Sequence, residues 1–296
     1  MTIVSSGAIS LNDLQNEFGG SNPIGINEYY AGAGIVYAGT INGSGEAIPS
    51  SGQVSFTKFY GSQQVPSSMP VRVLIVGGGG GGVRRSGGDN AAENGGAGAG
   101  GYVDATFNLP KGSYSFTIGS GTYMGTGGDT IAFGYTAYGG GYGGPSDSGG
   151  GGNGGSGGGA AERTGAYGSA IQPSSTSGNY GGQPGYGNNG SGGPHGGGGG
   201  AGSAANGGYG GSGRTWINGL TYAGGGGSSF GYTGGSGGGG NATQNATYYG
   251  GGGGGGYSGG SSPWIGTSGY QGIVVVSYQW NFQVFSGGYV ESSGSG

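Results

Sequence analysis

The feature that most constrains this chain is its unbroken blocks of glycine. The runs 77–82, 196–200 and 250–256 contain no other residue, and glycine supplies 94 of the 296 residues. Ordering one residue costs about 1–2 kcal/mol of backbone entropy, and glycine has no side chain whose packing could offset this. Any ordered fold of these blocks must therefore pack and hydrogen-bond their backbones directly against one another.

Two regular glycine-rich folds can be compared with this pattern. Collagen needs a strict three-residue phase with abundant proline, whereas the blocks have no phase and the chain has only 10 prolines. Strands of the polyproline II type have three residues per turn and no internal hydrogen bonds, so each N–H and C=O is free for a neighbouring strand. The blocks therefore predict a stack of polyglycine strands of this type.

Apolar segments with strand-like patterns bracket the glycine blocks. The clearest are 71–76 and 272–280, at the two ends of the glycine-rich part. The alternating segments 102–109 and 114–118, with a Pro-Lys-Gly-Ser turn between them, predict a hairpin. Shorter strands are expected at 130–133 and 221–223. We therefore expect a mostly irregular and β fold, in which a small β frame clamps a stack of polyglycine (polyproline-II-like) strands.

The first 62 residues contain less glycine and predict a separate small module of short helices and strands. Residues 9–11, 24–26 and 54–56 alternate as half-buried strands do. Residues 12–18 predict a helix, with Asn12 as its N-cap and Gly19 as its stop. The expected organisation is a virion-attachment module at 1–62, a linker at 63–70, a glycine-rich domain with aromatic loops at 71–280, and a C-terminal tail at 281–296.

Composition argues against several functional classes. Only 6% of the residues are charged and the net charge is −4, which disfavours nucleic-acid binding. The chain has no cysteine, and His195 is its only histidine, so we predict a turn residue there and no metal site. No basic leader precedes an apolar stretch, and no apolar run approaches the roughly 20 residues of a membrane span.

Catalytic motifs are equally weak. Residues 71–82 imitate a dinucleotide fingerprint, but that motif needs a helix directly after its glycines. The residues that follow are Val-Arg-Arg-Ser-Gly-Gly, which cannot begin one. The carboxylates show no spacing typical of a glycosidase pair. We therefore expect neither an enzyme nor a cofactor.

Aromatic residues lie in short segments between the glycine blocks, where a polyglycine stack would place its turns. One interpretation is that they pack against glycine backbones at the edges of the stack. The other is that some form a binding surface, because Tyr and Trp provide large contact areas at low entropic cost. The candidates for receptor binding are Tyr180, Tyr186, Trp216, Tyr248, Tyr249 and Trp264.

The ordered segments of the glycine-rich part occur in a familiar succession. An apolar strand runs into polyglycine, followed by a strand with a Pro-x-Gly turn, Thr-Ile-Gly, a Gly-Gly-Asp strand and a closing Gly-Ile-Val-Val-Val. This order resembles the glycine-rich domain of bacteriophage tail and tail-fibre proteins. Residues 9–20, 24–30 and 48–61 also resemble short N-terminal modules of phage tail proteins. The architecture is similar to that of the T-even tail-fibre tip adhesins, from which this chain differs in its N-terminal module and loop sequences.

This resemblance implies a structural protein of the virion tail. The implied partners are other phage tail, fibre or baseplate proteins and a host cell-surface receptor, either a glycan or an outer-membrane protein, with no nucleic acid. The resemblance leaves open whether the protein forms a homotrimer. The candidates for virion attachment are Leu11, Phe18, Tyr29, Tyr30, Phe59 and Tyr60. The main alternative is a purely structural tail or baseplate spacer, and an ice-binding protein is a more distant one.

Overall fold

The computed structural model of the chain describes residues 3–37, 39–62, 68–83, 91–110, 112–145, 149–161, 165–172, 175–176, 183–259 and 266–278. The chain divides into two compact units, Met1–Met69 and Pro70–Gly296. Helix occurs only in the first unit among the described residues, and the second consists of short strands and extended irregular backbone. The expected fold class, mostly irregular and β, is confirmed.

One short motif builds the first unit three times. Each copy is an apolar residue, an extended cap, and a turn of helix whose fourth residue is buried. The helical turns are α1 (Leu11–Phe18) and the 3₁₀ turns η1 (Ile26–Tyr29) and η2 (Phe56–Phe59). Their caps are Ser10, Gly25 and Ser55, and the buried residues four positions later are Leu14, Tyr29 and Phe59.

The predicted strands at 9–11, 24–26 and 54–56 are therefore wrong. The alternation is real, but only the cap at the centre of each triplet is extended, and the helical turn begins at the third residue. The helix at 12–18 exists and starts one residue earlier, because Ser10 rather than Asn12 is the N-cap. The Ser10 hydroxyl accepts a bond from the Asp13 N–H, and the Asp13 carboxylate accepts one from the Ser10 N–H, which forms a capping box.

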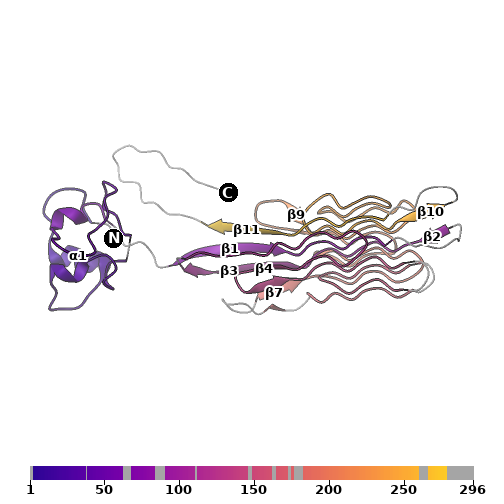
Figure 1. The fold of residues 1–296 in the computed structure, drawn as a ribbon, viewed down its shortest axis with the longest axis horizontal. Coiled ribbons are helices and arrows are strands. Elements are labelled where there is room, and N and C mark those ends of the chain that lie inside the picture. The colour runs from indigo at the N-terminus through magenta and orange to yellow at the C-terminus, as the bar shows by residue number, and fades with distance from the viewer. Residues whose placement is uncertain are drawn as a thin grey trace. The chain divides into compact units, whose positions relative to one another are not determined.

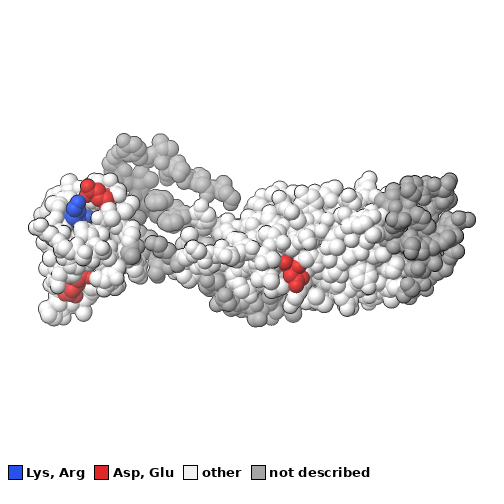
Figure 2. Space-filling model, in the orientation of Figure 1, with Lys and Arg blue, Asp and Glu red and all other residues white. Residues whose placement is uncertain are grey.

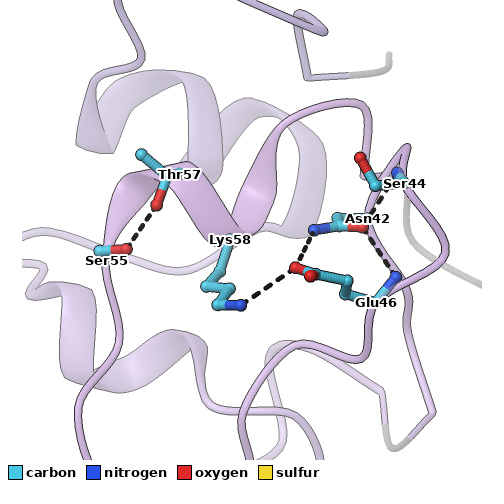
Figure 3. Close-up of polar contacts among 6 residues, drawn as sticks. All are labelled: Asn42, Ser44, Glu46, Ser55, Thr57 and Lys58. Atoms are coloured by element: carbon cyan, nitrogen blue, oxygen red, sulfur yellow. Dashed lines mark hydrogen bonds and ion pairs between the residues drawn. The ribbon is translucent and has the colours of Figure 1, made fainter.

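A polar turn replaces this arrangement beside the third copy. Lys58 stands where the first two copies carry an acid, so no capping box can form around Ser55. Instead, Lys58 Nζ donates to Glu46 Oε2 at 3.0 Å. The Asn42 side chain accepts from the Ser44 and Glu46 N–H groups and holds the Glu46 carboxylate in place (Figure 3).

The second unit contains a small β frame. Its main sheet has the order β11-β1-β3-β7-β6, in which β1 pairs antiparallel with β11 and β3 pairs antiparallel with β7. The bounds of these strands are β1 Ser68–Val76, β3 Tyr102–Pro110, β6 Ser175–Thr176, β7 Gln183–Tyr186 and β11 Ile273–Tyr278. Two ribbons of two strands complete the frame: β4 Thr130–Ala132 with β5 Tyr135–Ala137, and β8 Arg214–Thr215 with β9 Thr221–Tyr222. A third ribbon, β2 Ala91–Glu93 with β10 Tyr257–Gly259, lies apart from the frame (Figure 1).

Most predicted strands are confirmed, but the hairpin of 102–109 with 114–118 is wrong. Within the described residues β3 lies between β1 and β7, and 114–118 forms no strand. Thr117 instead exchanges two backbone hydrogen bonds with Ile131, at 2.9 and 2.8 Å. The stretch 63–67 of the predicted linker and the tail at 281–296 lie outside the described residues, and β1 already begins at Ser68.

The glycine strand 77–82 continues β1 into a lattice. Its N–H groups bond to three segments in rotation, and residues three apart share a segment. Gly77 and Gly80 donate to Gly101 and Gly98 of one segment. Gly78 and Gly81 donate to Gly128 and Gly125 of a second. Gly79 and Gly82 donate to Tyr270 and Thr267 of a third. This three-residue rotation is the geometry of a polyproline II strand, so the predicted polyglycine stack is present.

The same strand accepts hydrogen bonds from three further segments. The donors in these segments are the N–H groups of Gly140 to Gly78, Gly143 to Gly81, Thr122 to Gly79 and Gly253 to Gly80. The Thr267 N–H, in a segment that also receives, donates to Gly82. With three segments receiving its N–H groups and three others donating to its carbonyls, the strand is surrounded on all sides. Figure 1 shows the glycine-rich strands of this unit running side by side between the β frame and the β2–β10 ribbon.

Candidate binding surfaces of the glycine-rich unit

The described receptor-binding candidates lie at the β-frame end of the lattice, against one hydrophobic core. This core contains Leu74, Val76, Tyr102, Trp216 and Tyr222, with Tyr186, Tyr248 and Tyr249 packed against it. Tyr180 and Trp264 lie outside the described residues.

Trp216 is buried, with an exposed fraction of 5%. Its Nε1–H donates to Asp104 Oδ1 at 3.3 Å, and Asp104 also receives two bonds from the Arg72 guanidinium, at 2.9 and 2.7 Å. The hydrogen bonds that Arg72 donates to Asp104 raise the pKa of Arg72 above its ordinary value. These contacts give Trp216 a structural role, and receptor contact at this residue stays a prediction.

The three tyrosine candidates make similar packing contacts. Tyr186 meets Tyr102 edge to face at 5.9 Å, and the Arg214 guanidinium lies 3.7 Å from the centre of its ring. Tyr248 and Tyr249 lie 5.1 Å apart, and burial raises the pKa of the Tyr248 hydroxyl. The interpretation that aromatic residues pack at the edges of the stack therefore describes these half-buried side chains well.

A different set of turns lies at the opposite end of the lattice. The turns at 193–195, 206–209 and 229–232 all lie at this end, beside the β2–β10 ribbon. Ser228 N–H donates to Gly208 at 2.8 Å, Ser229 N–H donates to Asn94 directly after β2 at 3.2 Å, and Gly96 N–H donates to Gly196 at 2.9 Å. Backbone hydrogen bonds alone thus gather turns that are far apart in the sequence.

These turns bring four aromatic side chains together: His195, Tyr209, Phe230 and Tyr232. We call them the distal aromatic cluster. The His195 ring lies 5.4 Å from Phe230 and 6.1 Å from Tyr232, and Tyr209 meets Tyr232 edge to face at 5.0 Å. Tyr209 and Phe230 are more than half exposed, at 54% and 53%.

Phe230 is held there by an unusual backbone conformation. Phe230 and Gly231 both have positive φ, +67° and +77°, which is the pattern of a type I′ turn. A bulky residue rarely adopts this conformation, which costs about 1–3 kcal/mol when it does. Phe133 does so too, but that ring is buried against Phe107 and Phe116. Phe230 combines the strained backbone with a largely exposed ring.

Inspection of the sequence missed this cluster. His195 was expected to be a turn residue only, and it does occupy a turn, but the other three rings were not singled out. Whether these turns lie at the same end of the lattice depends on how many glycines separate successive turns and on whether each strand runs parallel or antiparallel to its neighbour. The signal available was the aromatic content of the turns 206–209 and 229–232.

Three of the six attachment candidates belong to the core of the first unit. Phe18, Tyr29 and Phe59 are buried and stack on one another at 6.0 to 6.3 Å. Leu11 packs against them. The Tyr30 hydroxyl donates to the Gly52 carbonyl and the Tyr60 hydroxyl to that of Gly7. Virion attachment through these residues stays a prediction, and the burial of Phe18, Tyr29 and Phe59 indicates that these three stabilise the module.

Neither a metal cluster nor a membrane span emerges in the described part of the chain. No group of three His, Cys, Asp or Glu side chains converges there. No helix among those residues has the length and hydropathy to cross a bilayer.

The pattern of extended glycine blocks held in a small β frame agrees with the comparison to known families. A family model described as a glycine-rich domain matches residues 55–279. The chain belongs to this glycine-rich domain family. The match begins at the third cap of the first unit and ends just after β11, so it includes the entire described lattice. Comparison with curated proteins found no match.

Proposed function

We propose that this protein is a structural component of a bacteriophage tail fibre or tail tip that presents loops for binding a host receptor. The observation that carries this proposal is the collection of three turns, with exposed aromatic rings, at the end of the lattice away from its β frame. Loops held on a rigid scaffold are common recognition sites, because little ordering entropy is lost on binding.

The first unit is the proposed attachment module. It has its own core, made from three copies of a cap and helical turn, and resembles the N-terminal modules of phage tail proteins. In this proposal it binds another tail, fibre or baseplate protein and the chain is located in the virion tail. The role requires no catalysis and no cofactor.

The test is binding of the fluorescently labelled full-length protein to a panel of bacterial strains. The expected result is saturable binding to some strains, and competition between the purified protein and phage particles that carry it. Absence of binding to every strain that such phage infect would refute the adhesive function.

The second candidate function is a rigid spacer with no receptor contact. It is favoured by the position of Trp216, Tyr248 and Tyr249 in packed contacts at the β-frame end. Both functions predict that alanine substitutions at these three residues lower stability. Only the spacer predicts that substitutions in the distal aromatic cluster leave adsorption unchanged, so phage carrying each set of substitutions separate the two functions.

A further inference from the structure

From the geometry of the distal aromatic cluster we infer that it binds the pyranose rings of a host-surface oligosaccharide. This inference rests on the proposed adhesive function and names the class of its ligand. Its basis is the form of the surface: rings of different orientation supported from below, with neutral polar groups beside them.

The support comes from the lattice. A Cβ atom added at Gly208 would overlap the ring of Tyr232, so this ring lies directly on the glycine backbone. Tyr209 stands edge to face against Tyr232, at an interplanar angle of 87°. Tyr232 is half-buried while Tyr209 is exposed, so the cluster has a fixed base and an accessible upper ring.

This arrangement suits a sugar. One face of a pyranose carries axial C–H groups, which stack on an aromatic ring, while its hydroxyls need neutral donors and acceptors around the rim. Asn206, which exchanges two backbone hydrogen bonds with Tyr209, and Thr233, next to Tyr232, are both exposed, and the tyrosine hydroxyls add further polar groups.

The charged side chains that the structure describes in this unit lie elsewhere. Its described charged side chains are Arg72, Asp104 and Arg214 around the β frame and Asp129, whose carboxylate accepts from the Gly139 N–H at 2.8 Å. On the face drawn in Figure 2, most of the described surface of the unit carries neither acidic nor basic atoms. The described side chains of the cluster itself offer stacking and neutral hydrogen bonds.

The test uses the full-length protein on an array of bacterial-surface oligosaccharides, with isothermal titration of each sugar that binds. Two variants remove the exposed rings. Tyr209→Ala truncates one ring, and Phe230→Asn removes the other with a residue that tolerates positive φ. Tyr278→Ala is the matched control, because Tyr278 is 42% exposed and pairs with Val71 at the opposite end of the unit.

The expected result is binding of at least one oligosaccharide, about tenfold or more weaker in each cluster variant and unchanged in the control. Circular dichroism and melting temperature establish that all variants are folded. Binding of no oligosaccharide, or equal binding by folded variants, overturns the inference. If the protein binds cells and protease treatment of those cells abolishes binding while free sugars do not compete, the ligand is a protein: the inference fails and the adhesive function stands. If the protein binds neither cells nor sugars, both the sugar inference and the adhesive function are refuted.

Discussion

At the scale of single residues, the lattice depends on glycine for a steric reason. Each residue of the 77–82 strand faces a neighbouring backbone, because three residues complete one turn and neighbours lie on all sides. A Cβ atom at Gly79 would overlap the carbonyl oxygen of Gly251, and one at Gly80 would overlap that of Gly141. Even the smallest side chain therefore forces two strands apart.

Gly79→Ala is expected to lower the free energy of unfolding of the glycine-rich unit by at least about 2 kcal/mol, since the backbone in its way cannot change rotamer. Gly112→Ala is the control. Its Cβ would meet only the Tyr114 side chain, at 3.6 Å or more, so stability should stay constant or rise by up to about 1 kcal/mol. Thermal unfolding of both variants measures the difference, and equal melting temperatures would contradict the steric argument.

Tyr102 carries an energetic cost at the β-frame end. Its hydroxyl is buried and has no hydrogen-bond partner among the described residues, and burial raises its pKa. Tyr102→Phe should therefore stabilise the unit, by about 1 kcal/mol, because an unpaired buried polar group is removed. Tyr222→Phe, in the same core, loses the bond from Asn218 Nδ2 at 2.9 Å and should destabilise by a similar amount. Chemical denaturation of both variants measures these changes in unfolding free energy. A destabilised Tyr102→Phe or a stabilised Tyr222→Phe would contradict the prediction.

At the scale of elements, the three copies in the first unit differ in how their caps are bonded. Ser10 caps α1 through its hydroxyl, whereas Ser55 makes no side-chain cap bond and its hydroxyl lies 2.7 Å from that of Thr57. Ser10→Ala should cost about 1 kcal/mol and Ser55→Ala less than about 0.5 kcal/mol. Hydrogen exchange of peptides from residues 1–62 reports this unit alone. Equal effects would show that the capping box contributes nothing particular.

The same elements predict how this unit responds to acid. Bonds from the Ser10 side chain and backbone lower the pKa of Asp13, and the bond from Lys58, followed by that from Asn42, lowers the pKa of Glu46. Each depressed pKa means stability that is present above the unfolded-state value, near 4, and is lost as the pH falls through the folded-state value. Protection of 1–62 should therefore decrease below about pH 4, and less so in Glu46→Gln. An identical acid response in Glu46→Gln would argue against a contribution from the Lys58–Glu46 ion pair. The expected difference is small, because this pair is exposed.

Sequence patterns predicted these elements unevenly. The strands β1, β4, β9 and β11 follow from apolar runs, and Gly19 ends α1 as expected. The pattern Ile-Gly-Ile at 24–26 failed because alternation cannot distinguish a half-buried strand from an extended cap that leads into a buried helical turn. The partner of β3 could not be predicted either, since β7 lies 73 residues further along the chain, from Pro110 to Gln183.

At the scale of the whole molecule, the glycine-rich unit should unfold as one body. Strand 77–82 bonds to residues as far along the chain as Thr267, which is 185 residues from Gly82, and Tyr270, so the lattice around this strand is complete only when the last segment is added. Ending the chain after residue 265 removes 266–272 and β11, and should abolish cooperative unfolding of the entire unit. Ending it after residue 280 retains every described strand and should preserve the transition. Circular dichroism during heating distinguishes these outcomes, and a cooperative transition in the shorter chain would contradict a single folding body.

The candidate site shows the same limit of prediction at this scale. The rings of His195, Tyr209 and Phe230 meet because strands of suitable length and direction end at one level. Aromatic content predicted that turns carry recognition residues, but it directed attention to Trp216, which the structure buries. Which turns share an end can be calculated only once the neighbours of every strand are known.

The threefold rotation of hydrogen bonds also has a consequence for evolution. Adding or removing three residues in a glycine strand returns every later residue to the same neighbour, whereas one or two residues would misalign all of them. Since the interior is backbone, a turn can be exchanged between two glycine blocks without selecting a new set of core side chains. Repeated glycine codons give recombination many equivalent crossover points. A gene of this kind can diversify its turns rapidly while the scaffold stays constant.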